Sequence, residues 1–185
     1  LGSEIRELSA RFSGYEFIFT DTGELDITDA GATAEFIAAN APSWIINCAA
    51  YTAVDRAEDE EKLATIINAG GVGNLVSALR GTDCRLIHIS TDYVFDGDSA
   101  RPYRADDIPR PLGAYGKSKL DGENLVRANT SEFLIIRTAW LYGVQGQNFV
   151  KTILRLARER EELRIVSDQR GSPTWTRDLA DALVK

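Results

Sequence analysis

The chain has 185 residues, 44% of them hydrophobic, which suffices for one sizeable folded domain with an apolar core. Its formal net charge of −7 and its pI near 4.8 argue against a surface that binds a nucleic-acid backbone. No apolar run approaches the roughly 20 residues of a membrane-spanning helix. We therefore expect a cytoplasmic protein whose partners are small molecules, with no nucleic acid and no membrane.

The start of the chain predicts a helix with no strand before it. The sequence contains no methionine, and it begins abruptly at Leu1. Residues 3–12 have a helical pattern, with Ile5, Leu8 and Phe12 on one face. A preceding strand is therefore expected to be missing from this stretch of sequence.

Strand-like and helix-like segments alternate along the rest of the chain. Strands are predicted at residues 15–20, 44–50, 85–90, 133–137 and 163–166. Helices are predicted at residues 29–40, 58–79, 115–127 and 148–160, and from residue 176 onward. Continuous apolar strands separated by helices indicate the α/β class, a doubly wound parallel sheet of Rossmann type. Small residues at Gly70, Gly71 and Gly73 are expected to allow close packing of the 58–79 helix.

Polar and small residues follow three of the predicted strands. In a parallel α/β sheet, ligands bind beyond the carboxyl ends of the strands. Residues 47–52 (Asn-Cys-Ala-Ala-Tyr-Thr) are small enough for a backbone to approach a flat or phosphorylated ligand. Residues 90–97 are rich in hydroxyls and carboxylates, and residues 137–143 (Arg-Thr-Ala-Trp-Leu-Tyr-Gly) follow the next strand. Each stretch alone also has a structural explanation, because polar residues cap helices and aromatic residues often only pack.

Tyr115 and Lys119 lie four residues apart, which places them on one face of a helix. The ordinary pKa of tyrosine is about 10, so a catalyst that uses the phenolic proton must stabilise the phenolate. A fixed lysine charge does so. The same spacing is common on exposed helix faces, so this pair gains weight only from its neighbours.

Together these stretches resemble the extended short-chain dehydrogenase/reductase superfamily. More narrowly, they are similar to the dTDP-4-dehydrorhamnose reductase (RmlD-type) family. The matching stretches are residues 25–29, 47–55, 90–97, 115–119, 137–143 and 168–174. The resemblance spans nearly the whole chain. It implies an NAD(P)-binding Rossmann-like domain over residues 1–142 without its first strand, and the start of an incomplete substrate-binding lobe over residues 143–185.

The resemblance also implies a reaction, in which NADPH or NADH reduces the C4 ketone of dTDP-4-dehydro-L-rhamnose to give dTDP-L-rhamnose for polysaccharide synthesis. Tyr115 would give the proton to the C4 alkoxide. Lys119 would hold the nicotinamide ribose and lower the pKa of Tyr115, and Thr91 would hydrogen-bond the substrate oxygen. The implied cofactor-binding residues are Gly2, Asp26, Ile27, Ala49, Ala50, Thr52, Tyr115 and Lys119. The implied substrate-binding residues are Asp92, Tyr93 and Trp140. The expected partner is a dTDP-linked 4-ketosugar, and association as a homodimer is left open.

The sequence departs from this family at the glycine-rich turn that holds the cofactor pyrophosphate. Only Gly2 corresponds to it, as the last glycine, which permits close helix–strand packing. We therefore expect this stretch alone to bind NADPH poorly. Asp21 lies about 20 residues later, where a carboxylate pairs with an NAD ribose, but a turn cap explains it equally well. Both cofactors therefore stay open.

Two other functions remain. One is a different nucleotide-sugar reductase or an epimerase of the same superfamily. The other is a non-catalytic protein that resembles the regulatory subunit of methionine adenosyltransferase. An intact set of Thr91, Tyr115 and Lys119 favours catalysis, because a binding module has no evident need for it.

The remaining chemistry-bearing residues have structural explanations. His88, the only histidine, is expected to be a packed strand residue, and Cys48 and Cys84 are expected to be buried reduced thiols. The acidic cluster over residues 55–61 is expected at a helix N-terminus rather than at a metal, so no metal site is predicted. The basic residues of the segment before and within the 115–127 helix could attract a nucleotide diphosphate, or lie solvated at the surface; they are Arg101, Arg104, Arg110 and Lys117.

Overall fold

The computed structural model describes residues 1–185 and divides into two compact units. One unit consists of residues 1–19 and 138–185, and the other of residues 20–137. The predicted division into a cofactor domain over 1–142 and a substrate lobe over 143–185 stays a prediction, because compactness does not tell what each part binds.

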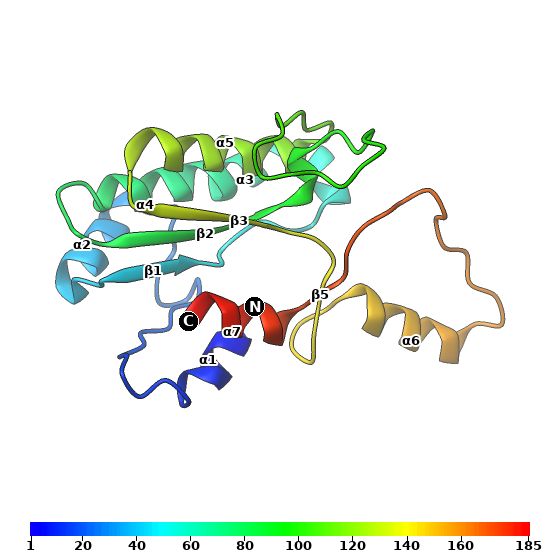
Figure 1. Ribbon diagram of the computed structural model, residues 1–185, viewed down its shortest axis with the longest axis horizontal. Helices are drawn as coiled ribbons and strands as arrows, with labels where there is room; N and C mark the ends of the chain where they lie inside the picture. The colour runs from blue at the N-terminus through cyan, green and yellow to red at the C-terminus, as the bar shows by residue number, and fades with distance from the viewer. The chain divides into compact units, whose positions relative to one another are not determined.

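The unit of residues 20–137 consists of a β-sheet with helices packed against it (Figure 1). Its sheet has the order β1-β2-β3, with β1 at Trp44–Asn47, β2 at Arg85–Thr91 and β3 at Phe133–Thr138. Its helical segments are α2 (Ala30–Asn40), η1 (Asp55–Glu58), α3 (Glu61–Thr65), η2 (Ile66–Gly71), α4 (Val72–Ala78), η3 (Asp92–Val94) and α5 (Ala114–Asn129). Strands β1 and β2 run parallel, with Asn47 opposite His88. The predicted α/β class is confirmed.

The apolar core of this unit lies between the sheet and α4 and α5, which cover one side of it (Figure 1). Leu86 of β2, Val72 and Val76 of α4, and Val126 of α5 are all buried in one cluster. Full burial of such a side chain stabilises the fold by roughly 1.5–3 kcal/mol relative to exposure. This cluster therefore fixes α5 against β2, with the polar residues at the carboxyl end of β2 beside it.

The predicted 58–79 helix forms as a run of helical turns that contains a π-helical segment, η2. Such a turn accommodates an extra residue and often marks a functional position. The small residues do allow close packing, because a Cβ on Gly71 would lie 2.7 Å from Cδ1 of Ile27. On α5, a Cβ on Gly122 would overlap the carbonyl oxygen of Asn68 in η2.

Two predicted strands are wrong. Residues 15–20 and 163–166 form no strand, because neither segment has a neighbouring strand with which to form a ladder of hydrogen bonds. The strand predicted over 44–50 ends early, at Asn47. The Asn47 side-chain oxygen accepts a hydrogen bond from the Ala49 amide at 3.1 Å, which is a local bond outside the sheet ladder.

The unit of residues 1–19 and 138–185 holds the predicted first and last helices, which pack together. They are α1 (Gly2–Ser9) and α7 (Thr176–Val184). Strand β4 (Leu141–Tyr142) pairs in parallel with β5 (Thr174–Trp175), and neither strand was predicted. Nη1 of Arg177 lies 3.3 Å from Oε2 of the buried Glu4. Ile5 and Leu8 are buried as the helical pattern predicted, whereas Phe12 lies beyond the end of α1.

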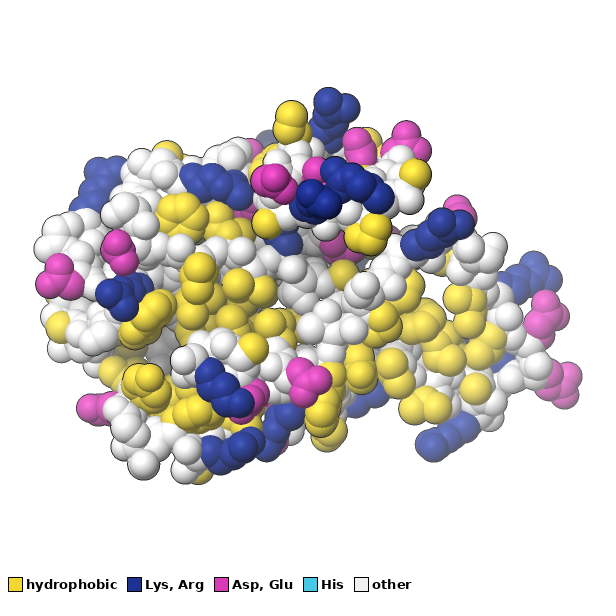
Figure 2. Space-filling model, in the orientation of Figure 1, with side chains coloured by type: hydrophobic (Ala, Val, Ile, Leu, Met, Phe, Trp, Pro, Cys, Tyr) yellow, Lys and Arg dark blue, Asp and Glu magenta, His cyan; other side chains and the backbone are white.

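Helix α6 (Phe149–Glu159) belongs to the same unit and begins after Asn148, whose side chain accepts a hydrogen bond from the Lys151 amide at 3.1 Å. None of its residues is buried, and apolar side chains gather over it (Figure 2). Phe149 and Leu154 are 61% and 56% exposed. No helix in the structure has both the length and the apolar composition that crossing a membrane would require.

The contact between Gly122 and η2 gives a test of the packing. Gly122→Ala should lower the free energy of unfolding by roughly 1–3 kcal/mol, because its Cβ meets a backbone oxygen that a rotamer change cannot move. Gly73→Ala is the matched control, since its Cβ would lie at an ordinary 3.5 Å from Leu125. It should be neutral or stabilise α4 by up to about 1 kcal/mol. Urea-induced unfolding measures both, and equal effects would contradict the close packing.

Candidate active site

Thr91 ends β2, and its side chain is the first of a polar group at the carboxyl end of that strand. It is 5% exposed. Its Oγ1 accepts a hydrogen bond from the Tyr93 amide at 3.2 Å and donates one to Oδ1 of Asp92 at 3.2 Å. Burial raises the pKa of Asp92, against the hydrogen bond from Thr91. The structure thus brings together the predicted residues Thr91, Asp92 and Tyr93.

Tyr115 lies in the first turn of α5 beside this group. Its ring meets the ring of Tyr93 edge-on, with 5.7 Å between the centroids. The next residue is glycine for a steric reason, since a Cβ on Gly116 would overlap the Tyr93 carbonyl oxygen. Burial raises the pKa of Tyr115, a hydrogen bond with the Thr91 side chain lowers it, and the Asp92 charge raises it further. The phenol is therefore protonated near neutral pH.

Lys119 lies one helical turn beyond Tyr115 and is 2% exposed. Its Nζ donates a hydrogen bond to the carbonyl oxygen of Ile89 in β2 at 2.7 Å. Burial lowers its pKa to about 8, although nearby Glu123 raises it. Lys119 is not among the groups that shift the Tyr115 pKa here, so the lowering of that pKa by Lys119 stays a prediction. The Tyr115 pKa is raised because burial of the phenol outweighs the other influences.

The loop after β1 is held in place by Asn68 of η2. Oδ1 of Asn68 accepts a hydrogen bond from the Tyr51 amide at 2.9 Å, and its Nδ2 donates to the Tyr51 carbonyl at 3.1 Å. The same Nδ2 donates to Oγ of Ser118 at 3.0 Å. Asn68 thus ties the predicted cofactor loop to the helix that carries Tyr115. Sequence reasoning missed it, although an asparagine inside the apolar run Ile-Ile-Asn-Ala was a signal.

The predicted cofactor residues of that loop are accessible: Ala49 and Thr52 are exposed, and Ala50 is half-buried. Two others lie in the segment before α2. Asp26 is exposed, and its Oδ1 accepts hydrogen bonds from the amide and the hydroxyl of Thr28, which lower its pKa. The Ile27 side chain lies in the core, and its carbonyl accepts a hydrogen bond from Asn74.

Asp21, which could have marked a preference for NAD, forms a local turn. Its Oδ1 accepts a hydrogen bond from the Thr22 amide at 2.8 Å, and its own amide donates to Oε2 of Glu24 at 2.8 Å. This geometry is that of the turn cap weighed as the alternative. The carboxylate gives no ground for choosing between the two cofactors.

Gly2 and Trp140 belong to the other unit. Gly2 is the first residue of α1, and a Cβ there would meet no atom within 4 Å, so its close packing against a strand stays a prediction. Trp140 has a left-handed backbone, with φ at 47°, and its side chain is 43% exposed. A Cβ on Gly171 would lie 2.8 Å from Cε2 of the indole. The 168–174 stretch therefore packs directly against Trp140.

Glu123 is the main functional candidate that sequence reasoning missed. It is fully buried on α5, one turn beyond Lys119. Its Oε1 accepts hydrogen bonds from Ser90 Oγ at 2.6 Å and Arg137 Nε at 2.9 Å. Its Oε2 accepts from Nη2 of Arg137 at 2.7 Å and Nη2 of Arg127 at 2.9 Å. A carboxylate at four-residue spacing after Tyr115 and Lys119 was the available signal.

His88 is a packed strand residue, as expected. It has no exposed surface, and its Nδ1 lies 3.2 Å from Nδ2 of Asn47. Its Nε2 has no hydrogen-bond partner. Burial lowers the His88 pKa to about 3, with the Lys119 charge acting in the same direction. The imidazole is therefore neutral near neutral pH.

The other expectations fare unevenly. Both cysteines are free, but only Cys84 is fully buried, whereas Cys48 is half-buried with a pKa that burial raises to about 11. Glu58 of the acidic cluster does serve a helix N-terminus, because its Oε1 accepts a hydrogen bond from the Ala114 amide at 2.8 Å. That helix is α5 rather than the helix next in sequence. No three His, Cys, Asp or Glu side chains are placed to hold a metal ion.

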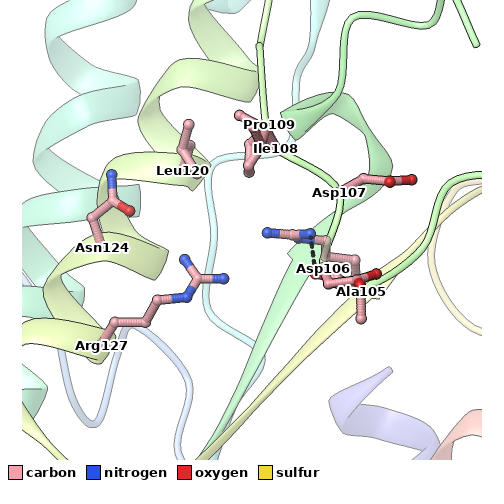
Figure 3. A pocket seen from close by; sticks show the side chains of 9 residues that line it. Ala105, Asp106, Asp107, Ile108, Pro109, Leu120, Asn124 and Arg127 are labelled. Atoms are coloured by element: carbon pink, nitrogen blue, oxygen red, sulfur yellow. Dashed lines mark hydrogen bonds between the residues drawn. The ribbon is translucent and has the colours of Figure 1, made fainter.

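A shallow pocket of about 350 Å³ lies beside the Glu123 network, between loop residues 105–109 and α5 (Figure 3). Leu120, Asn124 and Arg127 line it from the helix. It contains none of the predicted catalytic residues. Arg101, in the basic segment, forms two hydrogen bonds to Asp107 at 2.6 and 2.8 Å. Its charge is thereby neutralised, which weakens the idea that this segment attracts a diphosphate.

Comparison with known proteins then identifies the family. The family described as RmlD substrate binding domain matches residues 1–185. The chain belongs to this family. The resemblance predicted from the motifs is confirmed.

Relatives of this family are similar over almost all of the chain. The spore coat polysaccharide biosynthesis protein SpsK of Bacillus subtilis is 46% identical over 94% of this chain and 61% of its own length. A dTDP-4-dehydrorhamnose reductase of Aggregatibacter actinomycetemcomitans is 43% identical over 100% and 63%, respectively. The chain thus spans about three fifths of the length of these curated relatives.

Solved structures of the same kind share the fold. A dTDP-4-dehydrorhamnose reductase of Clostridium acetobutylicum has a TM-score of 0.94 and 45% identity, over 99% of this chain and 65% of that one. The same enzyme of Bacillus anthracis, in complex with NADP, has a TM-score of 0.91 and 42% identity, over 97% and 64%.

The buried imidazole predicts how stability depends on pH. The folded-state pKa of His88 lies below its ordinary 6.5, so under pH 6.5 the unfolded chain binds a proton that the folded chain does not. Stability is therefore full above that pH and falls as the pH drops toward 3. Between about pH 7 and about pH 5, the free energy of unfolding of the wild type should fall by about 2 kcal/mol more than that of His88→Gln. Urea unfolding at both pH values measures this, and equal losses would refute a neutral buried His88.

Proposed function

We propose that the protein carries the catalytic part of an NAD(P)H-dependent dTDP-4-dehydrorhamnose reductase, which reduces the C4 ketone of dTDP-4-dehydro-L-rhamnose. The observation that supports this most is the grouping of Thr91, Tyr115 and Lys119 at the carboxyl end of β2, with all three side chains buried. It occurs in a chain whose relatives are named dTDP-4-dehydrorhamnose reductases.

Tyr115 is the proton donor in this proposal. Its raised pKa keeps the phenol protonated near neutral pH, so a proton is available for the alkoxide that develops at C4. Thr91, hydrogen-bonded with Tyr115, would orient the phenol and contact the same substrate oxygen. Transfer of the proton leaves a phenolate, and the nearby Lys119 ammonium favours that charged form. With a pKa of about 8, Lys119 is mostly protonated at neutral pH.

The residues around this group fit a nicotinamide cofactor, which supplies the hydride when bound. Ala49 and Ala50 carry only methyl side chains that leave room for a flat or phosphorylated group, and Asn68 fixes their loop. Lys119 Nζ has three donors, of which Ile89 takes one, so two remain for ribose hydroxyls. NADPH is supported by the NADP complex of the Bacillus anthracis relative, and NADH stays open.

The substrate side is supported less directly. Tyr93 is 42% exposed beside Tyr115, and Asp92 is next to it, so both could contact the sugar. Trp140, in the other unit, stays a predicted substrate residue. Association as a homodimer and a cytoplasmic location also stay predictions.

A second substrate is favoured by a specific relative. A dTDP-4-keto-6-deoxy-D-glucose reductase of Streptomyces niveus is 44% identical over 87% of this chain. Comparing kcat/KM for the two dTDP-4-ketosugars decides between these substrates. Cofactor binding with turnover of neither sugar would favour the non-catalytic alternative.

Replacing the proposed proton donor tests the mechanism. Tyr115→Phe should reduce kcat for the dTDP-4-ketosugar at least about 100-fold, because the general acid is lost. The dissociation constant of NADPH, measured by calorimetry, should change less than about twofold, since the substitution removes only the hydroxyl group of the side chain. Tyr15→Phe, at an exposed tyrosine, is the control and should keep full activity. Tyr115→Phe with activity close to that of the wild type would exclude Tyr115 as the donor.

A further inference from the structure

Lys119 and Glu123 are two buried residues of opposite charge on one face of α5. They lie four residues apart, which places their side chains one above the other on a helix. Lys119 is 2% exposed and Glu123 has no exposed surface. Glu123 lies on the side of Lys119 away from Tyr115. It forms no hydrogen bond with the proposed proton donor or with the predicted substrate residues.

Glu123 is held as a carboxylate by its surroundings. Burial alone would raise its pKa, but hydrogen bonds from Arg137 and Ser90 and the Arg137 charge lower it below its usual range. Both carboxylate oxygens accept two hydrogen bonds each. Arg137 is itself mostly buried and forks across both oxygens, whereas Arg127 is 41% exposed. The negative charge at this buried position is therefore permanent near neutral pH.

Three other titratable groups near Lys119, Cys48, His88 and Tyr115, are neutral in that range. Cys48, after β1, has a pKa of about 11, and His88, on β2, has a pKa of about 3. Tyr115, on α5, is protonated, and Asp92 of η3 acts on Tyr115. Glu123 is thus the carboxylate that favours the ammonium form of Lys119 against the cost of its burial.

We propose that Glu123 is a positioning residue that keeps Lys119 protonated and bound to the Ile89 carbonyl, and that Arg137 and Arg127 limit this effect by neutralising part of the Glu123 charge. The proposal rests on the proposed function, because it assigns Glu123 a role in the reaction through Lys119. It also makes a statement about Lys119 that holds without any substrate.

A purely structural role would give a different outcome. Glu123 also links α5 with Ser90 on β2 and Arg137 on β3, so removing any partner could lower stability. Loss of packing would move the Lys119 titration in the same direction in every variant. The proposal requires opposite directions, because Glu123 carries a negative charge and Arg127 and Arg137 carry positive charges.

The test follows the titration of the Lys119 side chain by ¹³Cε NMR of lysine-labelled protein, with the signal assigned from Lys119→Arg. The wild type should titrate near pH 8. Glu123→Gln should lower the Lys119 pKa by about one unit or more, because two arginine charges then lack their partner. Arg127→Gln should raise it, because the Glu123 charge is then less compensated. Asp121→Asn, at an exposed carboxylate on the same helix, should leave it unchanged.

Two results would overturn the proposal. One is a Lys119 titration in Glu123→Gln that matches the wild type. The other is a shift of Glu123→Gln and Arg127→Gln in the same direction. If Glu123→Gln does not fold, Arg127→Gln decides alone, because the Arg127 side chain is 41% exposed and Arg137 still holds both oxygens of Glu123. In that case, an Arg127→Gln variant in which the Lys119 pKa does not rise overturns the proposal.

Activity supplies an independent readout that separates this proposal from the proposed function. In Glu123→Gln, the alkaline limb of the pH profile of kcat/KM should move to lower pH, since Lys119 then loses its proton more easily. An unmoved limb in an active variant would also count against the role of Glu123. If the wild type reduces neither ketosugar, the proposed function fails while the NMR titration still decides the effect of Glu123 on Lys119. If Tyr115→Phe abolishes turnover and Lys119 does not respond to Glu123, only the present proposal fails.

Discussion

The close packing of α5 against the carboxyl end of β2 is the constraint on which the candidate site depends. Glycines make it possible, because Gly116 meets the backbone of Tyr93 and Gly122 meets the backbone of Asn68. The inner face of α5 then carries Tyr115 and the two charged residues that follow it at four-residue spacing into the protein interior. A looser helix would leave these side chains in water, where their pKa values would be ordinary.

Burial of charge on this face requires compensation, because an isolated ion in a protein interior is strongly disfavoured. Lys119 is compensated by the Ile89 carbonyl and by the Glu123 charge, and Glu123 is compensated by Ser90 and two arginines. The contacts that hold these elements together are therefore the same contacts that set the charge states of the buried residues. The bonds that join α5 to β2 and β3 also determine which groups are charged where a ketone would be reduced.

Family membership and local geometry support the same function by independent routes. The relatives are named reductases of dTDP-4-ketosugars, and the end of β2 holds a protonated phenol, a hydroxyl and an ammonium. The hydrogen bonds that Asn68 makes to Tyr51 and Ser118 add a scaffold that neither the motifs nor the names indicate. It joins the loop proposed for the cofactor to the helix proposed for the acid.

The sequence alone determined what depends on local order and spacing. Alternating apolar segments gave the α/β class and most helices, and the four-residue spacing put Tyr115 and Lys119 on one helix face. Tertiary structure decided the rest. Residues 15–20 form no strand because a strand exists only with a partner to pair with, and the pKa of Tyr115 rises because burial depends on what packs around it. Asn68 and Glu123 emerged only there, since all of their hydrogen-bond partners except Arg127 lie 14 to 50 residues away in sequence.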